Sequence, residues 1–263
     1  MISSASFLRR DLNFSTKEDM KVLGIDTSTS CGSVGLVEDG AVISEYLLDI
    51  PLTHTERLLD EIGTVLTRSG CSMEDLTAWA ISLGPGSFTG LRIGVSAIKG
   101  LAFATRKPVV GVPTLDALAH QIAVTPHPIC PLLDARKGEV YTAMYAYGEG
   151  HTLQRISEYQ ALRPAHLLKT IRSQTIFLGS GVRTYRGVLE EYLGPLALFV
   201  PEPLNLPRGS IIACLGLERL KHNELLDLST FAPLYVRPSE AELRWNEPHS
   251  GTDRHGEGSC NPR

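Results

Sequence analysis

The sequence lacks the residue pairings on which most metal, redox and covalent sites depend. Its histidines include no His-x-x-x-His pair, and its cysteines are odd in number and never spaced as a metal or redox pair. Neither a Gly-x-Ser-x-Gly elbow nor a Cys/His arrangement is present. We therefore expect no catalytic residue, no metal and no cofactor, and scattered cysteines favour a reducing, cytoplasmic location. The cysteines are Cys31, Cys71, Cys130, Cys214 and Cys260.

Long apolar runs and an excess of positive charge are also missing. No run approaches the roughly 20 apolar residues that cross a bilayer, which argues against a membrane protein. The chain has 25 basic and 29 acidic residues, a formal net charge of −4. A chain that bound nucleic acid alone would be expected to carry a basic face, because phosphate neutralisation dominates such affinity. We therefore expect contact with nucleic acid only through a complex.

The two ends of the chain differ from its middle. Residues 1–19 contain Arg9 and Arg10 but also three acidic residues, and they lack the apolar segment of a secretion signal. Because Met20 and Lys21 directly precede the first strong strand, we interpret 1–19 as an upstream extension or a misplaced start rather than a transit peptide. Residues 238–263 are polar and without periodicity, so a disordered tail is expected there.

The first half of the middle region predicts three strands, a helix, a strand, a helix and a strand. Asp39-Gly40 is the expected tight turn between the second and third strands. Thr53 or Thr55 can cap the first helix, and Gly70 ends it. The strands are predicted over 22–28, 33–39, 41–49, 78–84 and 108–112, and the helices over 53–68 and 89–105.

A similar order of elements recurs in the second half, which predicts two units, 20–113 and 114–237. A closing helix over 210–221 could pack across either half. The remaining elements are predicted as helices over 114–123, 164–171 and 182–193, and strands over 128–134, 139–147, 175–179 and 197–200.

An acid and several hydroxyl side chains follow the first predicted strand, in residues 24–30. This turn is similar to the first phosphate loop of the actin, sugar-kinase and Hsp70 superfamily, in which a glycine usually stands two residues after the aspartate. Here Ser28 occupies that position, and its side chain should hinder close approach of a phosphate. The turn is thus either a structural hairpin or a vestigial nucleotide site. Residues of such a site would be Asp26, Thr27, Ser28, Gly84, Gly86 and Ser87.

The run from Gly84 to Val95 predicts a strand end, a tight turn, a capping hydroxyl and a helix start. The first amides of such a helix can accept an anion, but a strand-to-helix corner needs only glycine and a cap. The helix is apolar nearly all round, so both sides must be covered. One cover is its own sheet, and the other is either the helix over 53–68 or a second protein. Candidate partner-binding residues are His54, Leu58, Leu59, Ile62, Val65, Phe88, Leu91, Arg92, Val95 and Ile98.

Several phrases of the sequence occur in the order found in the TsaB family. They are IDTSTSCGSVGLVEDG, THTERLLDEI, GPGSFTGLRIGV, GVPTLDALA, LLDARKGEVYTAMY and PLYVR, and they cover about residues 20–237. The resemblance implies an α/β fold of two stacked actin-like ATPase (ribonuclease H-like) subdomains, with mixed sheets flanked by helices. It also implies binding to a catalytic paralogue, TsaD, with the ATPase TsaE joining the pair. TsaD transfers a threonylcarbamoyl group to adenosine next to the anticodon of tRNA.

The family's TsaD-facing surface uses two helices, which map onto the segments that begin at His54 and Phe88. The histidine pair that holds the catalytic metal of TsaD is absent from this sequence. The leading hypothesis is therefore a non-catalytic interaction subunit, whose apolar helical surface could also pair with its own copy as a homodimer in isolation. The alternatives are an autonomous kinase or ATPase that uses Asp26 and residues 84–87, and a metallopeptidase.

Overall fold

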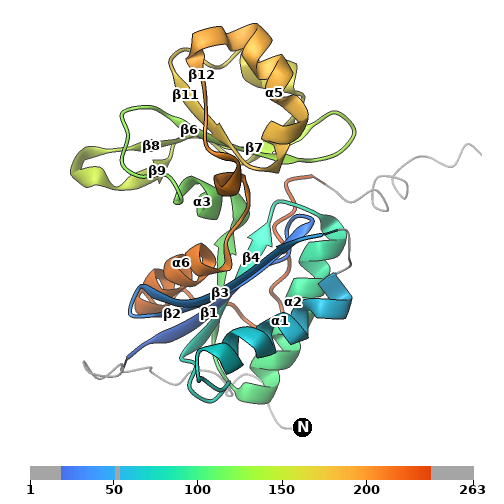
Figure 1. The fold of residues 1–263 in the computed structure, drawn as a ribbon, viewed down its shortest axis with the longest axis vertical. Coiled ribbons are helices and arrows are strands. Elements are labelled where there is room, and N and C mark those ends of the chain that lie inside the picture. The colour runs from blue at the N-terminus through green and yellow to red at the C-terminus, as the bar shows by residue number, and fades with distance from the viewer. Residues whose placement is uncertain (1–18, 51–53, 238–263) are drawn as a thin grey trace, which may run out of the picture.

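Two mixed sheets, each flanked by helices, lie one above the other in the computed structural model, which describes residues 19–50 and 54–237 (Figure 1). Within helix α1 the side chains of residues 54–56 lie outside the description, as do the predicted extension and tail and the predicted cap Thr53. The predicted fold class is confirmed. Of the helices described, none is long and apolar enough to cross a membrane.

The first sheet has five strands in the order β3-β2-β1-β4-β5. Strands β1, β2 and β3 form an antiparallel meander, and β4 and β5 continue the sheet parallel to β1. The predicted Asp39-Gly40 turn is confirmed, since both residues have positive φ, 48° and 89°. The strands are β1 (Lys21–Asp26), β2 (Cys31–Glu38), β3 (Ala41–Asp49), β4 (Ala78–Gly84) and β5 (Val109–Pro113).

Helices cover both faces of this sheet. Helix α1 (His54–Arg68) and helix α2 (Phe88–Thr105) lie beside each other on one face, and helix α6 (Gly209–Lys221) lies on the other (Figure 1). Apolar side chains of α1 and α2 share one core cluster with the sheet. The side chains of α6 form a second cluster on the opposite face. The sheet is therefore buried on both sides, as the apolar β4 predicts.

Helix α6 is held at its start by a carboxylate from the edge strand β3. Glu45 accepts hydrogen bonds from the main-chain N of Ser210 at 3.0 Å and from its Oγ at 2.6 Å, and it pairs with Arg208. Burial alone would raise the pKa of Glu45, but the hydrogen bonds from Arg208 and Ser210 outweigh it and lower the pKa below its ordinary value. The ionised side chain thus joins α6 to β3.

The second sheet repeats the arrangement of the first. Its main path is β10-β7-β6-β11-β12, in which the first three strands are antiparallel and the last three are parallel, while β8 pairs with β6 and β9. The predicted recurrence of elements is confirmed. The strands are β6 (Ile129–Asp134), β7 (Val140–Thr142), β8 (Tyr145–Tyr147), β9 (Leu153–Arg155), β10 (Gln160–Leu162), β11 (Thr175–Leu178) and β12 (Ala197–Phe199).

Predictions for the second half are less accurate than those for the first. The strand predicted over 139–147 is divided into β7 and β8, and the short β9 and β10 were missed because three residues give no readable alternation. Helix α3 stops at Ala119 because the next main-chain hydrogen bonds tighten to a 3₁₀ pattern. The other helices are α3 (Thr114–Ala119), α4 (Pro164–Leu168) and α5 (Ser180–Leu193), with short 3₁₀ turns η2 (Glu149–His151), η3 (Gly194–Leu196) and η4 (Glu202–Asn205).

The chain returns to the first domain after η4, and this corrects the predicted boundary of the second unit at 237. Helix α6 packs on the first sheet, and the following segment stays there. The main-chain N of Leu226 donates to Val109 O at 2.8 Å, and the N of Leu234 donates to Leu83 O at 2.8 Å. The apolar pattern of α6 predicts a covered helix but does not say which sheet covers it.

Candidate functional site

Helices α1 and α2 carry the predicted partner-binding residues, and most of these face inward. Their relative exposures lie between 0 and 6%, so the prediction that they contact a partner directly needs correction. Their side chains pack against the first sheet, because the apolar repeat of each helix lies on its sheet-facing side. The buried residues are Leu58, Ile62, Val65, Leu91, Val95 and Ile98.

The outer face of the two helices carries a different set of residues. Leu59 is 60% exposed, and Phe103, which sequence reasoning missed, is 81% exposed. Gly63 and Gly100 lie in the interiors of α1 and α2, and a Cβ added to either would meet no atom within 4 Å among the described residues. Mid-helix glycines were the signal in the sequence that could have indicated this face. His54 begins α1, but its side chain lies outside the description.

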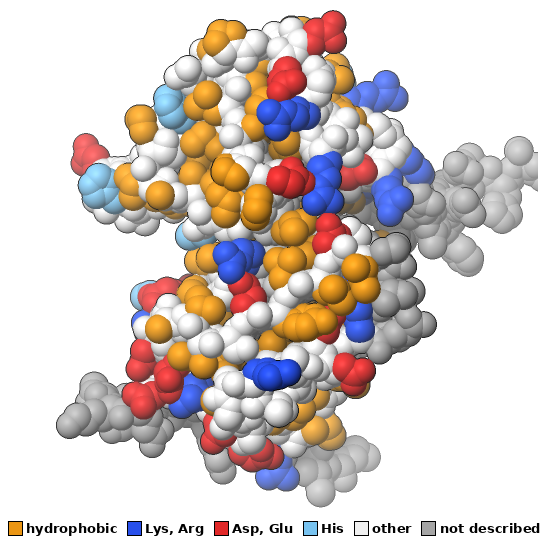
Figure 2. Space-filling model, viewed as in Figure 1, with side chains coloured by type: hydrophobic (Ala, Val, Ile, Leu, Met, Phe, Trp, Pro, Cys, Tyr) orange, Lys and Arg blue, Asp and Glu red, His pale blue; other side chains and the backbone are white. Residues whose placement is uncertain are grey.

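A cleft of about 820 Å³ separates the two domains. The molecule narrows at this level in Figure 2. From the first domain it is lined by residues 28–30 and by the start of α2, and from the second by the β6–β7 hairpin and the start of α5. Residues 234–237 line it as well. Three of the six predicted vestigial nucleotide residues, Ser28, Gly86 and Ser87, thus line the cleft opposite the second domain.

The acidic side chain at the end of β1, Asp26, accepts hydrogen bonds from within the loop that follows it. The carboxylate of Asp26 accepts hydrogen bonds from the main-chain N of Ser28 at 3.0 Å and from its Oγ at 2.9 and 3.1 Å. Asp26 and Thr27 are fully buried, and Ser28 is 1% exposed. Ser28, the residue that departs from the superfamily pattern, therefore engages both oxygens of the carboxylate.

The loop before α2 packs directly on this turn. The main-chain N of Ser87 donates to Ser28 O at 2.6 Å, and a Cβ on Gly86 would lie 2.4 Å from that same oxygen. Gly84 has a φ of 104°, which glycine adopts without strain. Ser87 Oγ accepts from Gly90 N at 3.3 Å and caps α2, as predicted. The structure therefore brings the six predicted nucleotide-site residues together, but packs them against one another.

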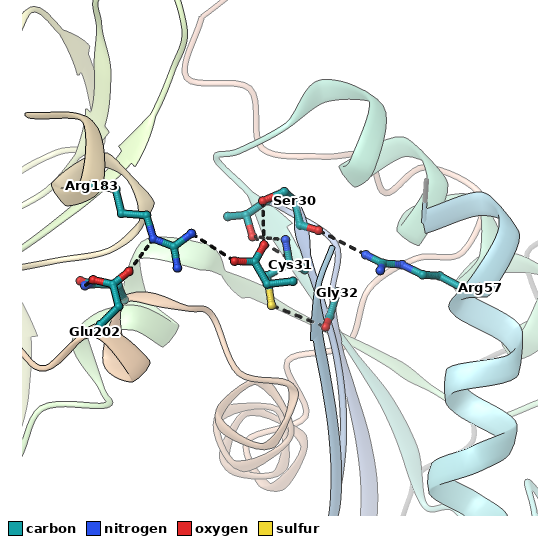
Figure 3. A network of polar contacts seen from close by, with 9 residues as sticks. Ser30, Cys31, Gly32, Arg57, Arg183 and Glu202 are labelled. Carbon is teal, nitrogen blue, oxygen red and sulfur yellow. Dashed lines mark hydrogen bonds and ion pairs between the residues drawn. The ribbon is translucent and has the colours of Figure 1, made fainter. Parts of the chain in front are cut away.

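A chain of polar contacts crosses the cleft from α1 to α5 (Figure 3). Arg57 of α1 donates to Ser30 O at 3.2 Å, and Ser30 Oγ donates to Asp49 at 3.0 Å. Asp49 also pairs with Arg183 of α5 at 3.1 Å. Arg183 in turn pairs with Glu202 at 2.5 Å. None of these contacts was predicted from the sequence, because the residues are far apart along the chain.

Residues 234–237, within the phrase PLYVR, form a strap from the first domain to the second. At its first end, the ring of Tyr235 lies 5.1 Å from that of Phe88, and Arg92 Nε donates to Tyr235 Oη at 3.2 Å. The Arg92 guanidinium also lies 3.8 Å from the centre of the Phe88 ring. Phe88 and Arg92, both predicted to bind a partner, thus make contacts within the chain.

The strap's second end is fixed in the β6–β7 hairpin. Arg237 donates to Glu139 Oε2 at 2.7 Å and to Ala135 O at 2.7 Å. In this hairpin Arg136 and Lys137 both have positive φ, 64° and 53°, a conformation that non-glycine residues seldom adopt. The PLYVR phrase therefore joins the α2 start to the hairpin of the LLDARKGEVY phrase.

Comparisons with known proteins agree with this geometry. The family model described as TsaD, tRNA N6-adenosine threonylcarbamoyltransferase, matches residues 51–245. The Bacillus subtilis tRNA threonylcarbamoyladenosine biosynthesis protein TsaB is 32% identical over 231 residues, which cover 87% of this chain and 99% of that protein. The Escherichia coli TsaB is 31% identical over 84% of this chain and 96% of its own length.

The chain belongs to the TsaB family.

Solved structures extend the family match to the fold. A Pseudomonas aeruginosa protein described as similar to peptidase YEAZ superposes with a TM-score of 0.71 at 27% identity, covering 83% of this chain and all of that one. A second structure, YeaZ from the same organism, has a TM-score of 0.69 and covers 82% of this chain and 99% of its own. The fold of this TsaB-family chain is thus found in solved structures.

Within residues 19–50 and 54–237, no group of three or more His, Cys, Asp or Glu side chains is placed to hold a metal ion.

One buried acid of α1 has no role in the sequence-based predictions. Glu61 is 3% exposed, and its pKa is raised by burial, against an opposing effect of Arg57. The Arg57 Nε and a Glu61 oxygen are 3.4 Å apart. Arg57 therefore contacts both Glu61, one turn further along α1, and Ser30.

Proposed function

We propose that this chain is a non-catalytic subunit that binds TsaD and supports transfer of a threonylcarbamoyl group to adenosine next to the anticodon of tRNA, with TsaE joining the complex. Family membership and the relatives' names support the pathway. The observation that carries the proposal is the outer face of α1 and α2, which exposes Leu59 and Phe103 beside two mid-helix glycines.

The glycines support docking of a helix. A glycine in a helix interior costs about 1 kcal/mol relative to alanine, and no contact within the described chain accounts for Gly63 or Gly100. Without a Cβ, the two helix backbones can be approached closely by helices of a partner. Exposed Leu59 and Phe103 then supply apolar area at the same interface.

The packing of the loop after β1 against the loop before α2 supports a non-catalytic role. Ser28 engages the carboxylate of Asp26, and the loop of Gly86 packs on Ser28. An autonomous ATPase would need the Asp26 loop to accept a phosphate, which would require these contacts to break. The alternative is tested by calorimetry with ATP and Mg²⁺ on the isolated chain. Micromolar binding that Asp26→Ala abolishes would favour the ATPase.

Co-purification with the cognate TsaD tests the interface. Leu59→Glu should lower recovery of the complex at least tenfold, because a charge would face an apolar partner, while leaving the melting temperature of the isolated chain unchanged. The matched control is Ile156→Glu in the second domain, where Ile156 is 58% exposed. Equal recovery of the two variants would mean that TsaD binds elsewhere.

Reconstituted tRNA modification tests the role in the reaction. TsaD and TsaE with their threonylcarbamoyl donor should modify tRNA only when this chain is added, and this chain should give no product without TsaD. The Leu59→Glu variant should fail to restore modification, whereas Ile156→Glu should restore it. In the absence of TsaD the same apolar face can pair with a second copy of the chain. Analytical sedimentation would then show a dimer for Ile156→Glu and a monomer for Leu59→Glu.

A further inference from the structure

The two domains share a hinge on one edge. The chain crosses between them after β5 and again after η4, and the crossings touch where Gln121 Nε2 donates to Leu206 O at 3.1 Å. Beside them, Asp116 of α3 accepts hydrogen bonds from the hydroxyls of Tyr145 and Tyr159, each at 2.7 Å. This edge is fixed by the two chain crossings and by part-buried polar contacts, so any change of interdomain angle turns about it.

The cleft is bridged by two separate ties. In the first, Arg183 of α5 pairs with Asp49 at the end of β3 (Figure 3). Arg183 is held in place from its own side by Glu202, which also accepts from Asn205 Nδ2 at 2.9 Å. Asn205 Oδ1 accepts from Gly179 N at the start of α5, at 2.9 Å. Contacts within the second domain therefore hold the Arg183 guanidinium in the position from which it pairs with Asp49 of the first domain.

The second tie is the strap. Tyr235 stacks on Phe88 of the first domain, and two residues later Arg237 binds Glu139 and Ala135 of the second. Both Arg183 and Arg237 line the cleft. Each tie is individually weak because it is partly exposed to solvent. Since both act within one chain, the closure of one raises the effective concentration of the other's partners.

We propose that the chain sets its interdomain angle with these two ties, Arg183–Asp49 and the Tyr235–Arg237 strap, and needs no bound ligand in the cleft to do so. The two ties span the cleft between the domains. On the first-domain side, the loop that follows Asp26 is closed by its own hydrogen bonds. Opening the cleft requires both ties to break, while the hinge at Asp116 stays intact.

Distances between spin labels on the full-length chain, without TsaD, test this proposal. Labels are attached at Thr67→Cys on α1 and Tyr192→Cys on α5, after Cys71, Cys214 and Cys260 are changed to serine. The parent should give one narrow distance distribution. Arg183→Ala combined with Arg237→Ala should widen it at least twofold, and each single variant, which keeps one tie, should stay near the width of the parent.

Arg186→Ala is the matched control, because Arg186 lies on the same helix, is similarly exposed and pairs with Glu190 of its own helix rather than across the cleft. It should leave the distribution unchanged. A double variant that superposes on the parent, or a control that widens as much, would overturn the proposal. If the double variant does not fold, Asp49→Asn with Glu139→Gln weakens the same ties from the other side by removing both carboxylate charges, and decides in its place. Because TsaD is not present, the result is independent of the proposed interface.

Discussion

The two faces of the first sheet use glycine in opposite ways. On the α6 face, a Cβ added to Gly24 would lie 2.3 Å from Gly209 O, and one added to Gly35 would lie 2.2 Å from Ser210 N. On the other face, Gly63 and Gly100 have open space around the missing Cβ. The first pair lets a helix and a strand of one domain approach closely. The second pair, we infer, does the same for a helix that comes from outside.

The largest expected effect is a loss of folding stability on the α6 face. Gly35→Ala should lower the free energy of unfolding by about 3 kcal/mol, because main-chain atoms of α6 would have to move. Urea unfolding followed by circular dichroism measures this. A loss below about 1 kcal/mol would show that α6 can shift easily, and the contrast between the two faces would disappear.

A smaller loss is expected from the carboxylate that holds α6. Glu45→Gln should cost about 2 kcal/mol at neutral pH, the range for hydrogen bonds to a charged group. Because folding lowers the pKa of Glu45, this stabilisation is present above the ordinary pKa of 4.5 and is lost as the pH falls through the lower folded-state pKa. Unfolding free energies of both proteins between pH 7 and pH 3 should therefore converge in acid. A constant difference would contradict the role of the charge.

On the α1–α2 face, the expected effect is on binding rather than on folding. Gly100→Leu should weaken TsaD binding about tenfold, which corresponds to about 1.4 kcal/mol, because its side chain would separate the helices. Titration calorimetry gives the affinity, and thermal unfolding of the isolated chain should show no loss. The same substitution at Gly187, an exposed glycine of α5 that also has open space, is the control. If both variants bind alike, the glycine does not mark an interface.

The smallest effect should have the opposite sign. Gly100→Ala should raise the free energy of unfolding by about 0.5 to 1 kcal/mol, because alanine has a higher helix propensity and a more restricted unfolded state. Urea unfolding under the conditions used for Gly35→Ala compares the two faces directly. A destabilised Gly100→Ala would reveal an internal contact at this glycine.

Much of the first domain was predictable from sequence, and less of the second. The β1–β3 meander has Asp39-Gly40 at its turn, and β2 and β3 are eight and nine residues long, so its signals are strong. Strands such as β9 and β10 are too short to show a period, and pairing with neighbours defines them. The candidate site was predicted in part. Its elements and its loops were identified, but the side chains that face outward on α1 and α2 were not.

The sequence by itself determined the order of elements in the first domain, the Asp39-Gly40 turn, the apolar faces of α1, α2 and α6, and the family. The tertiary structure alone decided that Leu58 faces inward while its neighbour Leu59 faces outward, that α6 packs on the first sheet, and that Arg92 meets Tyr235 across 143 positions of the chain. The physical reason is that an apolar period reports that a surface must be covered, but not what covers it. Contacts between distant residues leave no local pattern in the sequence.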